Sequence, residues 1–203
     1  MLDVNKNKEL TELIAFGFFF YVIPLFLLSF GYIPFEGRHV VLFLMGLILI
    51  AYAIQKKIKS KDLGIRTDNL KRALFYNLVS SLILVFILYF GYIAGFLKVV
   101  NYEGTFSFLI FYIFISVPIQ EFIFRSLMFY EIRLFTNNKL VLIGLSSIIY
   151  SFSHIMYQSL QVIIITTLAG IIWGMIYYRW PNYWGITLSH IIVGAAAVFV
   201  GIV

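Results

Sequence analysis

Two charged side chains lie in a stretch of this chain that is otherwise apolar enough to cross a membrane. Glu121 and Arg125 both fall within the run FLIFYIFISVPIQEFIFRSLMF. A charged side chain near the centre of a bilayer costs about 2.5–3.5 kcal/mol on insertion scales. Two of the three histidines, His154 and His190, also lie in apolar segments. A carboxylate, a guanidinium and two imidazoles are the ingredients of a site inside a membrane.

The spacing around Glu121 predicts a cavity next to it. Glu121 and Arg125 are four residues apart, so they share one helix face. Pro118 lacks a backbone N–H and its ring clashes with the carbonyl of Phe114, so the helix should kink here. The backbone groups that the kink frees need protein or water partners. We therefore expect a hydrated cavity beside the carboxylate.

Simpler interpretations exist for each of these residues alone. An ion pair between Glu121 and Arg125 would ease insertion of the helix, and a single membrane histidine often has a packing role. Because His154, His190, Glu121 and Arg125 occur together, we predict that Glu121, His154 and His190 line one cavity, with Arg125 near Glu121. Tyr150, one helical turn before His154, should face the same cavity.

One carboxylate and two imidazoles can do two kinds of chemistry. They can activate a water molecule by general base catalysis. Alternatively, Glu121, His154 and His190 can bind a divalent metal such as zinc as a set of two histidines and one carboxylate. The HExxH helix of metalloproteases is absent from the chain, so no motif supports the metal. Spacing alone leaves both possibilities open.

The composition predicts an all-α, polytopic membrane protein. Of the 203 residues, 62% are hydrophobic and only 12% are charged, about half the charged fraction of a soluble domain. The absence of cysteine excludes disulfides, a thiol nucleophile and a cysteine-based zinc site. The formal charge of +6 comes from basic residues beside apolar spans, which indicates membrane topology and not nucleic-acid binding. We expect a single integral membrane domain over residues 1–203, in the cell membrane.

About seven segments approach the 20 or so apolar residues that a transmembrane helix needs. They run near Leu13–Phe30, Val40–Ile54, Leu74–Leu97, Phe106–Met128, Leu140–Met156, Leu160–Tyr178 and Trp184–Val203. The second and fifth are short for full spans. Gly170 and Gly174 form a small-xxx-small face suited to close helix packing.

Basic residues predict the orientation of these spans, because cytoplasmic loops carry an excess of lysine and arginine. Seven of them crowd the one sizeable polar stretch, QKKIKSKDLGIRTDNLKR. With that stretch and the N-terminus in the cytoplasm, twelve basic residues lie inside, and only Arg38 and Lys98 lie outside. An aromatic belt is expected at the inner interface, made of Tyr177, Tyr178, Trp180, Tyr183 and Trp184.

Three runs resemble motifs of the CPBP family of intramembrane proteases, which includes the CAAX prenyl endopeptidases and the Abi bacteriocin-immunity proteins. QEFIFRSLMF resembles the first motif, two glutamates followed after three residues by arginine. SSIIYSFSH resembles the second, an aromatic residue four positions before a histidine. LAGIIWGMIYYRWPNYWGITLSH resembles the stretch leading into the third, a histidine followed after three residues by asparagine or a similar polar residue. The resemblance covers roughly Val117 to Ala197, so residues 106–203 would carry the family-like core.

The resemblance implies glutamate-dependent peptide hydrolysis inside the membrane. In the family, the first glutamate and the second-motif histidine activate water, and the third-motif histidine and its asparagine stabilise the oxyanion. The matching positions here hold Glu121 as the second glutamate, Arg125, His154 and His190.

Two positions depart from the family pattern. Gln120 stands where the first glutamate is expected, and an amide cannot act as a general base near neutral pH. Gly194 stands where the asparagine is expected and offers no side-chain donor. The fold of the family is therefore expected, with its catalytic machinery altered at two places.

Two functional hypotheses of different classes follow. In the first, the chain is an intramembrane endopeptidase with Glu121 as base beside His154, His190 polarising the scissile carbonyl, and Arg125 holding Glu121 or a substrate carboxylate. Its substrate would be a short peptide or protein tail, reaching the cavity from the cytoplasmic half. In the second, the chain is a catalytically silent membrane scaffold that binds a partner, as an immunity or regulatory protein would. A proton-coupled transporter is the weakest alternative, because inverted repeats and paired broken helices are absent.

Overall fold

The computed structural model describes residues 11, 17–97 and 106–201, and these residues form helices joined by short connections. No strand occurs in this part of the chain, which confirms the all-α class. The elements are η1 (Phe18–Val22), α2 (Ile23–Ser29), η2 (Phe35–Gly37), α3 (Arg38–Gln55), α4 (Leu70–Ile93), α5 (Phe106–Phe111), η3 (Tyr112–Ser116), α6 (Val117–Glu121), η4 (Phe122–Leu127), α7 (Met128–Arg133), α8 (Lys139–Phe152), η5 (Ile155–Tyr157), α9 (Leu160–Arg179) and α10 (Tyr183–Phe199).

Five helical stretches within the described residues are long and apolar enough to cross a membrane. They are Phe35–Gln55, Leu70–Ile93, Phe106–Arg133, Lys139–Tyr157 and Leu160–Arg179, with shorter apolar helices at Phe18–Ser29 and Tyr183–Phe199. Five long and two shorter helices agree with the predicted number of about seven. The second and fifth predicted segments were expected to be short, and this was wrong, because 3₁₀ turns extend them to 21 and 19 residues. The chain is a multi-pass membrane protein.

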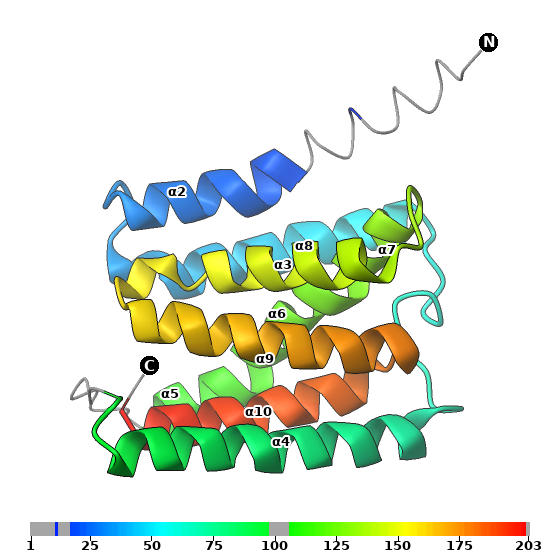
Figure 1. Ribbon diagram of the computed structural model, residues 1–203. Helices are drawn as coiled ribbons and strands as arrows, with labels where there is room; N and C mark the ends of the chain where they lie inside the picture. Colours follow the sequence, from blue (N-terminus) through cyan, green and yellow to red (C-terminus); the bar gives the residue numbers. More distant parts are fainter. Residues whose placement is uncertain (1–10, 12–16, 98–105, 202–203) are drawn as a thin grey trace.

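The connections are sorted to the two ends of the helix bundle. Figure 1 shows α3, α4, α8, α9 and α10 running roughly side by side, with the segment 56–69 and the α9–α10 turn at the same end. Hydrogen bonds join the segment 56–69 to the helix ends on either side of this turn: the Tyr177 hydroxyl of α9 donates to the carbonyl of Leu63 at 2.9 Å, and the N–H of Tyr183, the first residue of α10, donates to that of Gly64 at 2.8 Å. The basic segment therefore packs on the turn that leads into α10.

Small residues allow α8 and α9 to approach closely. A Cβ atom added at Gly170 would lie 3.2 Å from the Cα of Ser147, and one at Gly174 would lie 3.2 Å from the Cγ2 of Ile143. The packing face predicted from these two glycines is therefore confirmed, with α8 as its partner. This contact holds the helix that carries Tyr150 against the helix that carries Trp173.

A polar seam joins α4 to α10 within the apolar bundle. The hydroxyls of Ser81 and Ser189 are 2.7 Å apart, and the Trp173 indole N–H donates to Ser189 at 2.9 Å. Asn77 accepts on its backbone oxygen from both Ser80 and Ser81 at 2.8 Å. Hydrogen bonds of this kind between membrane helices contribute about 0.6 kcal/mol each on average. The bonds of Ser189 to Ser81 and Trp173 hold this part of α10 in place, and with it the next residue, His190.

The stretch Phe106–Arg133 is not a regular α-helix. It contains two π-helical segments, η3 and η4, on either side of α6, and α6 begins with Val117 and Pro118. The expected disturbance at Pro118 therefore takes the form of altered backbone hydrogen bonding on both sides of this residue. The Tyr183 hydroxyl donates to the Pro118 carbonyl at 3.1 Å. The α6 segment contacts both α3 and α10, so Gln120 and Glu121 lie in the centre of the bundle.

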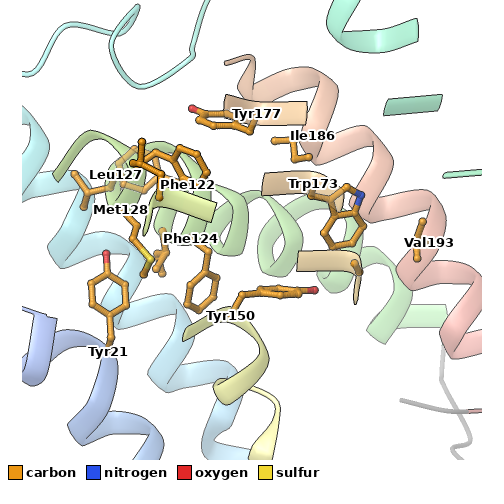
Figure 2. Packing of buried hydrophobic residues seen from close by; sticks show 14 of the residues in the cluster. Tyr21, Phe122, Phe124, Leu127, Met128, Tyr150, Trp173, Tyr177, Ile186 and Val193 are labelled. Carbon is orange, nitrogen blue, oxygen red and sulfur yellow. The ribbon is translucent and has the colours of Figure 1, made fainter. Parts of the chain in front are cut away.

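Several aromatic side chains form part of the buried core around this central helix. Figure 2 shows Phe124, Tyr150, Trp173 and Tyr177 among the packed side chains of the cluster. Tyr177 is only 1% exposed, so its predicted place in an interfacial aromatic belt was wrong. The Tyr177 hydroxyl donates to the basic segment instead. Trp184, another member of the predicted belt, is half exposed.

Candidate functional site

The centre of the site is a contact between a carboxylate and an imidazole. Glu121 lies at the end of α6 and His190 in the middle of α10, and both side chains are buried. The Nδ1 atom of His190 is 2.7 Å from the Oε1 atom of Glu121. An ionised carboxylate only accepts hydrogen bonds, so the proton of this contact belongs to His190 Nδ1. A neutral ring then presents an unprotonated Nε2 atom on its other side.

Arg125 neutralises the carboxylate from the next turn. Its Nε atom is 4.0 Å from Glu121 Oε2, and neither side chain is exposed. The Nη1 atom of Arg125 donates to the Ser146 hydroxyl at 3.0 Å, and Ser146 in turn donates to the Phe124 carbonyl at 3.0 Å. The guanidinium also lies 4.9 Å from the centre of the Tyr150 ring, a cation–π contact. Arg125 thus places a positive charge beside the buried carboxylate of Glu121.

His154 lies where α8 gives way to the 3₁₀ turn η5. Its Nδ1 atom is 2.9 Å from the backbone carbonyl of Tyr150. A carbonyl can only accept, so Nδ1 of His154 carries a proton and its Nε2 atom is the basic nitrogen of the neutral ring. The ring packs edge-on against Tyr150 with 4.8 Å between centroids, and it stacks on Tyr157. Backbone geometry therefore fixes the tautomer of this histidine.

Tyr150 connects the two histidines. Its hydroxyl is 3.3 Å from His190 Nε2, and its ring lies 5.7 Å from the His190 ring and 4.8 Å from the His154 ring. Figure 2 shows the hydroxyl end of Tyr150 directed toward the side where Trp173 lies. One aromatic side chain, that of Tyr150, therefore contacts the rings of both histidines.

A cavity of about 140 Å³ adjoins this cluster. Its polar lining includes Gln120, Ser116, His154, His190, Tyr150 and Tyr112, whereas most of its wall is apolar. Gln120 donates from Nε2 to the Ser116 hydroxyl at 2.9 Å. A space of this size holds several water molecules, or one water and an apolar side chain.

The cavity lies away from the basic end of the bundle. Its lining includes residues from the first half of α3, from η5 and from the second half of α10, parts that lie toward the end opposite the segment 56–69 (Figure 1). Arg38 and His39, at the start of α3, are part of the lining. The expected approach of a substrate from the basic, cytoplasmic half is therefore not favoured by this shape.

The five residues singled out from the sequence all lie in this region, but only three of them line the cavity. Gln120, His154 and His190 line the cavity, as predicted for the two histidines. Glu121 and Arg125 do not line it; they lie behind His190 and Tyr150 and are fully buried. The prediction that Glu121 faces the cavity was wrong because its carboxylate is turned toward His190 on the neighbouring helix.

Sequence reasoning missed Ser116, Ser146 and Tyr112. Ser116 is one helical turn before Gln120, and this spacing could have indicated their hydrogen bond. Ser146 and Tyr112 come from parts of the chain whose closeness to the site only the packing of the helices reveals.

The hypothetical metal ligands do not form a binding set. Within the described residues, no group of three or more His, Asp or Glu side chains is arranged to hold a metal ion. His190 Nδ1 is already bonded to Glu121, and His154 Nδ1 to a carbonyl, so only the Nε2 atoms point elsewhere. The geometry fits proton transfer better than coordination by Glu121, His154 and His190.

Comparison with protein families agrees with the motifs. Residues 102–196 match the family model described as Type II CAAX prenyl endopeptidase Rce1-like. The match contains the whole cluster of Gln120, Glu121, Arg125, His154 and His190, and it confirms the resemblance to the CPBP and CAAX protease family for this part of the chain. Searches of curated proteins and of solved structures gave no match.

Proposed function

We propose that this chain is an intramembrane endopeptidase of the CAAX-protease type, which cleaves a peptide or protein tail in the cell membrane. The observation that carries the proposal is the 2.7 Å contact between Glu121 and His190, whose ring faces a cavity within an Rce1-like domain. A carboxylate that orients an imidazole toward a reaction space is the arrangement that activates a nucleophile in hydrolytic enzymes.

The base in this proposal is His190, with Glu121 as the residue that positions it. A general base must come within about 2.6–3.2 Å of the proton that it removes, directly or through one water. Glu121 is fully buried behind His190, so its carboxylate is not placed to meet a cavity water. His190 lines the cavity and presents Nε2, which Tyr150 contacts at 3.3 Å and which a water can take over. This division of labour differs from the expectation that Glu121 is the base and His190 the polarising group.

Hydrolysis then proceeds with balanced proton transfers. A water oxygen bonds to the scissile carbonyl carbon, its proton passes to His190 Nε2, and the carbonyl electrons move onto oxygen. When the tetrahedral intermediate collapses, the C–N bond breaks and the imidazolium returns the proton to the leaving amine. His154, with its own basic Nε2 at the cavity, accepts the second hydrogen bond of the attacking water.

The substrate should be apolar and extended, because apolar side chains form most of the cavity wall. Since the lining gathers at the end away from the segment 56–69, we propose that the tail enters from that end. If the basic segment faces the cytoplasm, as its charge indicates, entry is from the opposite side of the membrane. Lipid surrounds the protein, whose outer faces carry many exposed apolar side chains such as Phe75, Leu82 and Ile148.

The test is cleavage of a peptide library by purified protein in detergent micelles. The wild type should cleave apolar peptides, and Glu121→Gln and His190→Gln should each lower kcat by roughly 10²–10⁴-fold, the usual contribution of a general base. Ser80→Ala, a buried polar change in the α4 seam away from the cavity, is the matched control and should keep full activity.

A catalytically silent scaffold is the second candidate, and Gln120 is the observation that favours it. This amide lines the cavity, at the position where the family pattern has a glutamate, and it is held by Ser116. In a scaffold, the same cavity would bind a partner segment without cutting it. Binding of peptides by the wild type, without cleavage under any condition, would decide for the scaffold.

A further inference from the structure

We propose that the hydroxyl of Tyr112 is the hydrogen-bond donor to the oxyanion in the reaction described above, in the place of a side chain that residue 194 lacks. The inference rests on the proposed function. The observation that supports it is a steric overlap between Tyr112 and residue 194. A Cβ atom added at Gly194 would lie 1.6 Å from the Tyr112 hydroxyl oxygen and 2.6 Å from Cζ. The phenol therefore occupies the volume in which a side chain at residue 194 would begin.

This volume is next to the proposed base. Gly194 follows His190 by one helical turn, and Cβ positions so spaced are about 5–6 Å apart on one helix face. The Tyr112 and His190 rings meet edge to face with 6.3 Å between their centroids. The hydroxyl of Tyr112 is thus within one side-chain length of the imidazole that takes the proton.

Tyr112 reaches this place from a distant helix. It is the first residue of the π-helical segment η3, and it lines the same cavity as His190, Gln120 and Ser116. Among the described residues, none forms a hydrogen bond with its hydroxyl. A phenol O–H that faces a reaction space without an internal partner is available to a ligand oxygen.

A donor is needed there because neither histidine supplies one in its neutral form. His190 Nδ1–H is used by Glu121, and His154 Nδ1–H by the Tyr150 carbonyl, so both Nε2 atoms are acceptors. When water adds to the scissile carbonyl, the oxygen gains the charge that its C=O bond loses. The Tyr112 O–H then donates to this oxyanion and keeps its proton throughout, so no further reactant is required.

The first experiment compares Tyr112→Phe with the wild type in the cleavage assay. The Phe ring keeps the shape of the site, so KM should stay close to its wild-type value, whereas kcat should fall roughly 10²–10³-fold, as for loss of one oxyanion donor. Tyr89→Phe, which removes a hydroxyl from a side chain that is 55% exposed on α4, is the matched control and should change neither constant.

A second set of variants separates donation from space filling. Tyr112→Ala empties the volume over Gly194, and the pair Tyr112→Ala/Gly194→Asn returns a donor to it, whereas Tyr112→Ala/Gly194→Leu returns only bulk. We expect the asparagine pair to recover most of the lost kcat and the leucine pair to recover none. Equal recovery by both would mean that Tyr112 only fills space, and the inference would be wrong.

A binding measurement decides the matter when cleavage is absent. The probe is a peptide whose scissile bond is replaced by a phosphinate, a stable tetrahedral anion, compared with the unmodified peptide. Tyr112→Phe should weaken phosphinate binding about 10- to 100-fold, the effect of one hydrogen bond to a charged group, and leave peptide binding unchanged.

A wild type that cleaves while Tyr112→Phe keeps its kcat overturns this inference alone. A wild type that cleaves nothing, with phosphinate affinity lost in Tyr112→Phe, overturns the proposed function alone. Absence of both effects overturns both.

Discussion

Glu121 and Arg125 face each other inside the bundle without a hydrogen bond between them: Glu121 Oε2 is 4.0 Å from Arg125 Nε, and both side chains are fully buried. The stronger contact of the carboxylate is with His190, at 2.7 Å. Arg125 thus acts mainly as a nearby charge. Its removal leaves an uncompensated buried carboxylate, whereas removal of both charges leaves none.

The first prediction concerns this buried pair. Arg125→Gln should lower the free energy of unfolding by about 3–5 kcal/mol, because it strands the Glu121 charge. The double variant Glu121→Gln/Arg125→Gln should lose less than the sum of the two single variants. Unfolding can be followed by circular dichroism as the SDS fraction of mixed micelles is raised. Arg72→Gln, on an exposed position of α4, should stay within about 0.5 kcal/mol of the wild type.

A second prediction concerns Gln120, which lines the cavity beside Ser116. Gln120→Glu places a carboxylate where a water can be activated directly, so kcat should rise at least about tenfold in the peptide assay. Gln120→Met, similar in length but without polar atoms, should not raise it. A Gln120→Glu variant no faster than the wild type would mean that the glutamine position does not limit the reaction.

The third prediction tests the close packing of α8 on α9. Gly170→Leu adds a side chain where even a Cβ atom lies 3.2 Å from the Cα of Ser147, so overpacking should cost about 1–3 kcal/mol of unfolding free energy. Gly144→Leu is the matched control on α8, because nothing lies within 4 Å of a Cβ atom there. Equal stability of the two variants would contradict the packing described.

Membrane orientation is the subject of the fourth prediction. Cysteines replacing Ser60, in the basic segment, and Glu36, at the other end of the bundle, are both exposed and should label from opposite sides of the membrane. The positive-inside rule predicts that Ser60→Cys reacts with an impermeant maleimide only after the cytoplasmic face is opened. The neighbouring Gly37 is not suitable for this substitution, because a Cβ atom there would lie 2.8 Å from the Cγ2 of Ile33. Labelling of Ser60→Cys in intact cells would reverse the orientation and the proposed side of substrate entry.

Much of the fold could be predicted because hydropathy determines which segments become membrane helices. The number of helices and the glycine face on α9 follow from composition and spacing alone. Helix ends were less predictable, since the 3₁₀ turns at Phe35–Gly37 and Ile155–Tyr157 continue helices beyond their apolar cores. Tyr177 was misplaced because an aromatic residue at a helix end looks the same in sequence whether it faces lipid or the Leu63 carbonyl.

The membership of the site could be predicted, but not the direction in which each side chain points. Charged and imidazole groups are costly in a bilayer, so Glu121, Arg125, His154 and His190 were recognisable from the sequence. That Glu121 turns to His190 and leaves Gln120 at the cavity depends on the π-helical turns around α6, which shift the helix faces relative to a regular α-helix. No local pattern encodes this rotation.

The overlap between Tyr112 and a side chain at residue 194 means that these two positions should covary in evolution. Because one volume serves both, a side chain can be gained at residue 194 only in a lineage where residue 112 has already become small. The reverse order, a tyrosine arriving at residue 112, requires that residue 194 has first been reduced to glycine. Homologues should therefore divide into two groups, with tyrosine opposite glycine in one and a small residue opposite asparagine in the other. Intermediates that carry both large side chains would be selected against through misfolding, whatever their activity.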